Sequence, residues 1–210
     1  MTKELKNFVG GEFVDTQNGS VSELVNPSTG EVFATAPISG AADLDRAYGV
    51  AAKAFESWKN STPSERQQAL LTIADTFEAH AQELVDIESE NTGKPIPVTM
   101  EEELPPMIDQ IKFFAGAARI LEGKAAGEYM SGFTSMVRRE PIGVIGQVTP
   151  WNYPMMMAVW KFIPAIAAGN TVVLKPSDTT PASTLKMAEL IAQSGALPDG
   201  VFNVVCGDRD

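Results

Sequence analysis

GVIGQV (143–148), TVVLK (171–175) and VFNVV (201–205) are three short apolar runs in the last third of the chain, and they decide its fold. Two stretches of helical composition, 154–168 and 181–194, separate them. Buried strands that alternate with helices are typical of a parallel sheet whose two faces are covered. We therefore predict an α/β protein in which a β-α-β-α-β unit forms the first half of a Rossmann-like parallel sheet. Three such strands alone would leave an edge strand unpaired.

Proline and glycine mark the limits of the two helices. Pro154 lies in the first turn of the first helix, Pro164 bends this helix, and Gly169 ends it. Thr180 caps the second helix, and Gly195 stops it. The two connections are thus long enough for the right-handed crossovers that parallel strands require.

Short strands followed by helices are predicted before this unit. Alternation and turn residues place strands within 8–38, with a turn at NPSTGE (26–31). From about residue 40 the spacing becomes helical. The first apolar helix face is made by Leu44, Ala47, Ala51, Ala54, Phe55 and Trp58.

Three further helical segments are predicted after this face. TPSE (62–65) is a capping box with proline at the first helical position, and it starts a helix. The next helix ends at Gly93 as a left-handed cap. A third helical stretch covers about 98–122, is divided by the prolines at 105–106, and is closed by Gly123. Residues 124–142 mix β-formers with glycines, which predicts an extended arm or hairpin between two domains.

The composition narrows the class of protein. The formal net charge is −11 and the chain has one cysteine and one histidine. The acidic excess argues against nucleic-acid binding, and no apolar run is long enough to span a membrane. A single cysteine excludes an internal disulfide, and no cluster of metal ligands is apparent. We predict a cytoplasmic protein without a metal site.

The candidate site lies where the three strands end, because ligands of open α/β sheets bind beyond the carboxyl ends of the strands. This rule selects Thr149–Tyr153, Lys175–Asp178 and Cys206–Asp208. The first turn has no GxGxxG motif, so a glycine-rich phosphate cradle is absent. Asn152 offers an amide donor for an oxyanion. Trp151 and Tyr153 are pocket walls or core side chains, and the core interpretation is the more common one for aromatic residues.

The charged candidates each have a structural alternative. Lys175 and Asp178 either bind the hydroxyls of a ribose or form a solvated loop pair. Lys161 is either a lysine that reaches solvent from an apolar helix, which we favour from the residues alone, or a partly buried group that moves a proton. The run Glu101–Glu103 is either favourable charge at a helix N-terminus, which we prefer, or a wall that selects cationic substrates.

Two residues with reactive side chains are set aside. Cys206 has no histidine nearby to activate it, so we interpret it as a small apolar residue at a strand end. His80 has no accompanying ligands and cannot form a metal site alone.

Several spaced motifs together resemble the NAD(P)-dependent aldehyde dehydrogenase superfamily from about residue 7 onward. These motifs are TPWNYP (149–154), WK (160–161), PAIAAGNTVVLKPSD (164–178), LPDGVFNVV (197–205), NPSTGE (26–31) and ENTGKP (90–95). FFAGAARILEG (113–123) and the stretch 125–144 resemble the aminobutyraldehyde and betaine-aldehyde branch in particular. The resemblance implies the N-terminal portion of an aldehyde dehydrogenase fold.

Site roles follow from this resemblance. It implies that Asn152 donates to the oxyanion of the reacting aldehyde, that Pro150 and Trp151 line the nicotinamide side of the cofactor cleft, and that Lys161 belongs to a proton relay. The segment 175–178 implies contacts to the adenosine ribose. The implied cofactor-binding residues are Pro150, Trp151, Asn152, Lys175, Pro176, Ser177, Asp178 and Gly207.

The resemblance also implies a cofactor, a substrate and an assembly. Asp178 stands where the family has glutamate, and an acid there repels a 2′-phosphate, so NAD is favoured over NADP. The implied substrate is a small (amino)aldehyde of the kind formed in polyamine degradation, with Glu103 as a substrate contact. The implied parts are strands and helices of the cofactor-binding domain (1–123), an arm of the oligomerisation region (124–142) and half of the NAD-binding sheet (143–210). The full-length family is homo-oligomeric.

The family's nucleophilic cysteine and its general-base glutamate have no counterpart in this chain. Cys206 does not match the motif of the catalytic cysteine. We therefore predict an N-terminal portion of an NAD-dependent aldehyde dehydrogenase that does not turn over aldehydes by itself. The alternative is a non-catalytic module that binds a nucleotide or a partner protein.

Overall fold

The computed structural model describes residues 3–17 and 19–208. Its central sheet contains the three parallel strands, which are β8 (Val144–Val148), β9 (Thr171–Lys175) and β10 (Phe202–Val204). Two short strands, β2 (Asn7–Val9) and β3 (Glu12–Val14), extend this sheet, so the strand order is β3-β2-β10-β9-β8. The predicted strands are confirmed, with β10 shorter than expected.

The N-terminal hairpin covers the edge of β10 that the three parallel strands alone would leave open. Phe8 of β2 pairs with Val204 of β10 in an antiparallel register. Two side chains fix this junction: the Asn203 Oδ1 accepts from the N–H of Gly10 at 3.0 Å, and the Asn7 Oδ1 accepts from the N–H of Cys206 at 2.8 Å. The other edge strand, β8, has no neighbour on its outer side in the described chain and is only partly buried.

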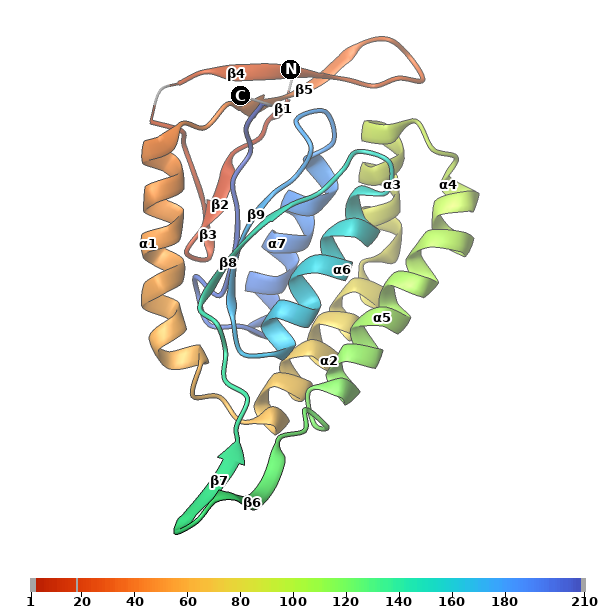
Figure 1. Cartoon of the computed structure of the whole chain (residues 1–210). Coiled ribbons are helices and arrows are strands. Elements are labelled where there is room, and N and C mark those ends of the chain that lie inside the picture. The colour runs from red at the N-terminus through yellow and green to blue at the C-terminus, as the bar shows by residue number, and fades with distance from the viewer. Residues whose placement is uncertain (1–2, 18, 209–210) are drawn as a thin grey trace.

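Helices cover both faces of the sheet (Figure 1). The crossover helices α6 (Pro154–Ala167) and α7 (Ala182–Ser194) pack on one face, and α1 (Ala41–Trp58) packs on the other. Leu44, predicted for the buried face of α1, is instead 40% exposed. Asp43 is buried in its stead, because its carboxylate accepts hydrogen bonds from groups at and before the start of the helix.

An outer layer of helices packs against α6 and α7. It consists of α2 (Pro63–Ala79), α3 (Ala81–Thr92) and α5 (Leu104–Ala117). The capping box is confirmed: the N–H of Glu65 donates to the Thr62 Oγ1 at 3.2 Å, and the Glu65 carboxylate accepts from the N–H of Thr62 at 2.6 Å. Gly93 ends α3 with a φ of 76°, as predicted for a left-handed cap.

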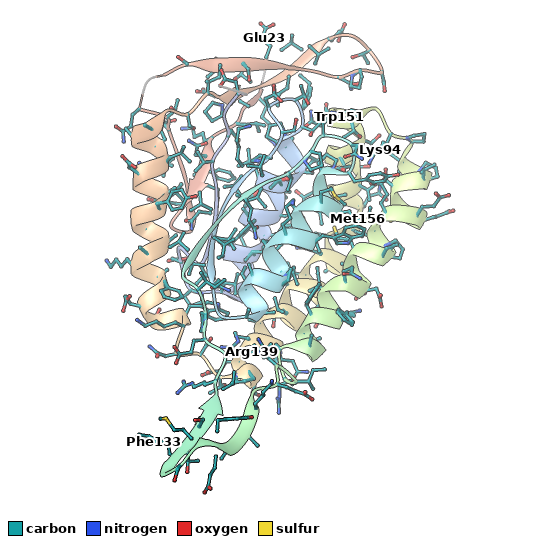
Figure 2. The ribbon with its side chains drawn as sticks, in the orientation of Figure 1. Glu23, Lys94, Phe133, Arg139, Trp151 and Met156 are labelled. Carbon is teal, nitrogen blue, oxygen red and sulfur yellow. The ribbon has the colours of Figure 1, made fainter. Side chains whose placement is uncertain are left out.

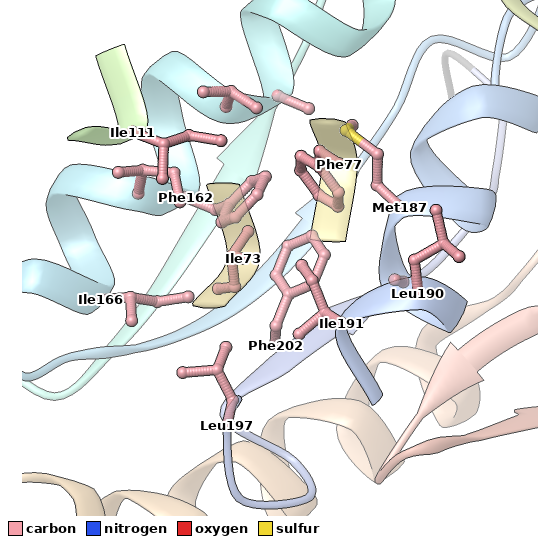
Figure 3. Packing of buried hydrophobic residues seen from close by; sticks show 14 of the residues in the cluster. Ile73, Phe77, Ile111, Phe162, Ile166, Met187, Leu190, Ile191, Leu197 and Phe202 are labelled. Atoms are coloured by element: carbon pink, nitrogen blue, oxygen red, sulfur yellow. The ribbon is translucent and has the colours of Figure 1, made fainter. Parts of the chain in front are cut away.

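The main hydrophobic core lies between these two helix layers and the sheet (Figure 3). Phe162 of α6 and Phe202 of β10 lie with their ring centroids 4.3 Å apart. Side chains from α2, α5 and α7 surround them, including Ile73, Phe77, Ile111, Met187, Leu190 and Ile191. One apolar cluster therefore joins this face of the sheet to the two helix layers, and a second, smaller cluster packs α1 against the opposite face.

The helical stretch after α3 is more divided than the sequence predicts. A short helix α4 (Ile96–Val98) leads into a π-helical turn η1 (Thr99–Glu103). The two prolines lie in the first turn of α5, directly after this π-helical turn. The prediction that Gly123 closes this helix is wrong, since α5 ends at Ala117. Gly123 instead lies against the carbonyl of Val137, where a Cβ atom would clash.

A hairpin and a separate small sheet lie at opposite ends of the molecule (Figure 1). The hairpin consists of β6 (Lys124–Met130) and β7 (Phe133–Val137) and projects away from the core, in the segment predicted as an arm or hairpin. At the other end β1 (Lys3–Glu4), β4 (Val21–Val25) and β5 (Val32–Pro37) form a three-stranded sheet. None of the described helices combines the length and the apolar composition needed to cross a membrane.

Candidate functional site

The carboxyl ends of the parallel strands meet at one edge of the sheet. The N–H of Thr149 donates to the carbonyl of Lys175 at 3.1 Å, and the N–H of Val205 donates to the carbonyl of Leu174 at 2.9 Å. The segments that follow β8, β9 and β10 therefore lie side by side. This edge is where open α/β sheets bind ligands, so it is the candidate site.

The turn after β8 lies at the surface. Thr149 is buried, but residues 150–153 are all exposed, and Trp151 keeps 66% of its surface accessible. The interpretation of Trp151 and Tyr153 as core side chains is therefore wrong. The physical reason is that β8 is an edge strand, so no described strand covers the outer side of this turn. The Asn152 side chain is exposed beside them, at the strand end.

Lys94 connects this turn to the end of α3. Its ammonium nitrogen lies 4.1 Å from the centroid of the Tyr153 ring, a cation–π contact. The carbonyl of Tyr153 in turn accepts from the N–H of Met157 at 2.8 Å, which starts α6. Figure 2 shows Lys94 and Trp151 labelled at the same end of the molecule. The turn is thus anchored on one side by α6 and on the other by Lys94.

The loop after β9 places a cation and an anion at the same edge. Lys175 is half-buried, and its ammonium donates to the carbonyl of Pro176 at 3.4 Å. The Ser177 hydroxyl donates to the Asp178 Oδ1 at 3.1 Å, and the carbonyl of Ser177 accepts from the N–H of Thr180. Ser177 and Asp178 keep part of their surface accessible. The four residues therefore form an ordered loop that presents polar side chains at the strand end.

Asn91 holds this loop from behind and is not among the predicted site residues. It is buried on α3, donates to the carbonyl of Thr179 at 2.9 Å, and accepts from the N–H of Ala182 at 3.2 Å. These bonds satisfy a loop carbonyl and one of the free N–H groups at the start of α7. The signal was the ENTGKP motif, which gave the resemblance but no role for its asparagine.

The segment after β10 carries a buried, unreactive thiol. Cys206 is buried, and burial raises the pKa of its thiol to about 12. A thiol that stays protonated at neutral pH is a poor nucleophile, which agrees with setting Cys206 aside. Gly207 is half-buried, and a Cβ atom there would make only an ordinary contact, 3.6 Å from the Cε of Lys175. Gly207 thus lies next to the loop after β9.

Lys161 lies on the exposed side of α6. Its backbone carbonyl accepts from the Gln147 side chain at 2.8 Å, which ties α6 to β8. A partly buried lysine is therefore not what the structure shows, because this side of α6 follows the open edge of the sheet. A role for Lys161 in proton transfer stays a prediction.

Glu103 is placed differently from its predicted role as a substrate contact. It is buried, whereas Glu101 and Glu102 are exposed. The Lys94 ammonium lies 2.8 Å and 2.9 Å from its two carboxylate oxygens, so its charge is already compensated. A cationic substrate would have to displace this lysine, and we do not retain Glu103 as a substrate contact.

Glu88 is the second carboxylate beside Lys94, and sequence reasoning missed it. Its side chain is fully buried on α3, with one oxygen 3.9 Å from the Lys94 ammonium. Burial raises its pKa to about 7, although the Ser183 hydroxyl, Lys94 and the N–H of Met155 act in the opposite direction. Neither Ser183 nor Met155 reaches a hydrogen bond of normal geometry with it. Its signal in the sequence, a glutamate within a helix, is too common to be informative.

The titratable residues outside this edge do not suggest a metal centre. His80 lies at the junction of α2 and α3, with its Nδ1 3.2 Å from the Glu83 carboxylate. Within 3–17 and 19–208, no group of three or more histidine, cysteine, aspartate or glutamate side chains is placed to hold a metal ion.

Comparison with known proteins gives a consistent result. Residues 13–210 match the sequence model described as "Aldehyde dehydrogenase family". The chain is 41% identical over 205 residues to an aldehyde dehydrogenase of Deinococcus radiodurans, covering 98% of this chain and 39% of that protein. It is 40% identical to a long-chain-aldehyde dehydrogenase of an Acinetobacter species, covering 97% of this chain and 40% of that protein.

Solved structures agree with the sequence comparison. The crystal structure of PnpE, a protein of Pseudomonas sp. WBC-3, in complex with nicotinamide adenine dinucleotide, superposes with a TM-score of 0.93 at 40% identity. This match covers 97% of the present chain and 41% of PnpE. The chain therefore spans about two fifths of the length of the proteins that it matches.

Proposed function

Because the chain belongs to the aldehyde dehydrogenase family, we propose that it supplies the cofactor-facing part of an NAD-dependent enzyme that oxidises aldehydes to carboxylic acids. In this proposal the strands β8, β9 and β10 are the first half of a Rossmann-like dinucleotide-binding sheet. The chain then corresponds to the N-terminal part of such an enzyme.

One observation carries this proposal. The Asn152 turn and the Lys175–Asp178 loop come from different strands, yet a hydrogen bond between Thr149 and Lys175 joins their first residues. An amide donor, a cation and an anion are thus held along one strand-end edge. This is the set of groups that an extended dinucleotide needs for its ribose and its reactive end.

Lys175 and Asp178 carry the polar groups that the ribose of NAD would bind. The Asp178 carboxylate can accept hydrogen bonds from ribose hydroxyls, and the Lys175 ammonium can donate to the same sugar. A carboxylate at this point repels a 2′-phosphate, which supports NAD over NADP. Pro176 and Ser177 shape the loop, and Gly207 lies beside Lys175. A bound NAD would accept the hydride that leaves the aldehyde carbon.

The turn after β8 serves the reacting end in this proposal. Pro150 and Trp151 form a flat, apolar surface that excludes water from one side of the nicotinamide ring. The Asn152 amide donates a hydrogen bond to the negative oxygen that forms when the aldehyde carbonyl is attacked. Lys161, two turns along α6, moves a proton at the open edge of the sheet.

The substrate is proposed to be a small aldehyde. The resemblance of 113–144 to the aminobutyraldehyde and betaine-aldehyde branch supports an aminoaldehyde. One finding reduces this support: Glu103 is already paired with Lys94, so its carboxylate does not await the amino group of a substrate. The broader class, a small aldehyde with or without an amino group, is therefore the one that we retain.

The experiment is a calorimetric titration of this chain with NAD and, separately, with NADP. We expect NAD to bind, NADP to bind at least tenfold more weakly, and Lys175→Ala to reduce NAD affinity by about tenfold, the loss of one charge-assisted hydrogen bond. Asp178→Asn should reduce the ratio of the NAD affinity to the NADP affinity, because it removes the charge that repels the 2′-phosphate.

Lys53→Ala is the matched control. Lys53 is an exposed lysine on α1, which covers the face of the sheet opposite to α6 and α7. This variant should leave the affinity unchanged. Binding that is equally strong in the Lys175→Ala and Lys53→Ala variants would contradict the proposed ribose site.

A second candidate function is that of a nucleotide-binding module without catalysis. The burial and the raised pKa of the Cys206 thiol favour it. Cys206 is the only cysteine of the chain, is buried, and has a raised pKa. We therefore expect no formation of NADH when the purified chain is mixed with NAD and a short aldehyde, measured by ultraviolet absorbance. A Cys206→Ser variant serves as the control. Aldehyde-dependent NADH formation that this substitution abolishes would show that Cys206 is catalytic and would overturn the expectation.

A further inference from the structure

A buried charge cluster lies directly behind the turn that carries Asn152. It consists of Glu88, Lys94 and Glu103, which come from α3, from the loop after its cap, and from the end of η1. All three side chains are mostly or fully buried, with exposed fractions of 0%, 21% and 7%. Its charges are two carboxylates and one ammonium, so the cluster carries an excess negative charge when both acids are ionised.

The cluster contacts the turn at two points. Lys94 reaches the Tyr153 ring, with 4.1 Å between its ammonium and the ring centroid. Glu88 faces the first turn of α6 at the N–H of Met155, and the start of α7 at Ser183. Two helix N-termini and one ammonium thus surround a carboxylate whose oxygens have no hydrogen-bond partner of normal geometry.

This arrangement is unbalanced. The Lys94 ammonium is 2.8 Å from a Glu103 oxygen but 3.9 Å from a Glu88 oxygen. It therefore forms a close ion pair with Glu103 and only a long one with Glu88. A buried carboxylate without hydrogen bonds costs free energy unless it is protonated or attracts its neighbours. An ionised Glu88 would attract Lys94 and the N–H groups of α6, and protonation would remove this attraction.

We propose that Glu88, Lys94 and Glu103 are positioning residues that set the location of the Asn152 turn, through Lys94 on Tyr153 and through Glu88 on the first turn of α6. The charged and titratable groups that face Glu88 are Lys94 and Glu103, and Tyr153 faces Lys94 from the turn. The turn thus has two arrangements, one for each protonation state of Glu88. This role deepens the proposed function, on which it rests, because it controls the geometry of the proposed oxyanion donor.

The test follows the backbone of the turn in this chain without cofactor. The chain has three tyrosines, so labelling with ¹⁵N-tyrosine gives three amide signals, which Tyr48→Phe and Tyr129→Phe assign. From about pH 5 to about pH 8 we expect the Tyr153 signal to shift with one midpoint near neutrality, where an ordinary glutamate no longer titrates. The signals of Tyr48 and Tyr129 should stay in place.

Variants identify the group responsible. Glu88→Gln should abolish the shift of the Tyr153 signal, and Glu90→Gln, an exposed carboxylate on the same helix, should keep it. His80→Gln, which removes the single histidine, should also keep it. Lys94→Met should move the Tyr153 signal at every pH and reduce its pH dependence. Its control is Lys59→Met, because Lys59 likewise pairs with a glutamate and lies 5.5 Å from an aromatic centroid, that of Phe55.

Two outcomes would overturn the inference. A Tyr153 signal that does not titrate in the unmodified chain shows that the turn ignores the cluster, and this result stands even if Glu88→Gln fails to fold. A titration that survives unchanged in folded Glu88→Gln or Lys94→Met assigns it to another group. Both results are independent of whether NAD binds, so a failure of the proposed function remains distinguishable from a failure of this inference.

Discussion

Asp43 and Glu88 illustrate the two possible results of burying a carboxylate. Burial opposes ionisation of Asp43, but hydrogen bonds from Thr16, Gln17 and Gly40 outweigh it and lower the pKa of Asp43. Glu88 lacks such hydrogen bonds, so burial dominates and raises its pKa to about 7. Two differences separate these carboxylates: Glu88 is the more deeply buried, with 0% of its surface exposed against 6% for Asp43, and it has fewer hydrogen-bond donors.

The raised pKa of Glu88 predicts a specific pH dependence of stability. Between the ordinary value of 4.5 and about 7, the folded chain binds a proton at Glu88 that the unfolded chain has released. The free energy of unfolding therefore falls as the pH rises through this window, by up to about 3 kcal/mol, since a tenfold change in proton affinity is about 1.4 kcal/mol. Urea unfolding of the unmodified chain and of Glu88→Gln across this range measures the effect.

The two chains should differ most above pH 7, where Glu88→Gln no longer has a buried anion and is the more stable of the two. Glu90→Gln is the control and should follow the unmodified chain. A stability difference between Glu88→Gln and the unmodified chain that is constant with pH would show that Glu88 does not titrate in this window.

At the scale of single elements, a local signal places the start of α2. The predicted Thr180 cap of α7 is wrong, because Pro181 is the N-cap and the buried Thr180 hydroxyl has no hydrogen-bond partner in the described chain. The Thr62–Glu65 capping box is complete in the structure, with both reciprocal hydrogen bonds. Thr62→Ala removes the side-chain acceptor for the N–H of Glu65 and should lower the free energy of unfolding by about 1 kcal/mol. Urea unfolding monitored by circular dichroism provides the measurement. Thr62→Ser retains the hydroxyl and should lose little, and an equal loss in both variants would mean that the cap hydrogen bond is not the cause.

The elements that could be predicted from sequence are those with local signals. The three apolar strands, the proline-started helix α6 and the glycine-ended helix α3 follow from periodicity and from cap residues. The end of α5 could not be placed, because Gly123 looks like a cap but is required by close contact with Val137 in the hairpin. The π-helical turn before α5 carries no local signal, since i→i+5 bonding depends on tertiary packing.

The candidate site likewise has features that follow from the sequence pattern and features that depend on tertiary contacts. Its position followed from the rule that parallel strands end at one edge, and this rule also places Asn152 and Lys175 together. The exposure of Trp151 and Tyr153 did not follow, because it depends on β8 being an edge strand. Asn91, Glu88 and Lys94 were missed as well, since their roles come from contacts to segments that are distant in the sequence, such as the loop that Asn91 holds.

For the whole molecule, an exposed apolar surface lies on the β6–β7 hairpin, away from the candidate site. Large apolar side chains of the β6–β7 hairpin are more than half exposed, among them Tyr129, Met130, Phe133 and Met136. An exposed patch of this kind marks a surface for association. The open edge of β8 is a second such surface, because its backbone groups can pair with another strand.

We predict that the hairpin drives self-association of this chain. Phe133→Ser combined with Met136→Ser should lower the mass measured by sedimentation at a given concentration, with little change in stability because both side chains are exposed. The control is Val21→Ser with Val25→Ser, which removes exposed apolar side chains from β4 at the other end. If Val148→Lys, on the edge of β8, is the change that lowers the mass, the sheet edge rather than the hairpin is responsible.

The junction between the N-terminal hairpin and β10 has a consequence for how the chain is made. Gly10 and Asn203 are 193 residues apart, and Asn7 and Cys206 are 199 apart. A ribosome that adds 5 to 20 residues per second needs roughly 10 to 40 s to synthesise the residues between two such partners. Throughout that interval β2 can pair with β3 but not with β10, while the helices between β3 and β10 can already fold through local contacts. Chaperones that shield unpaired strands during translation would therefore act on the first residues of this chain, long after those residues have been synthesised.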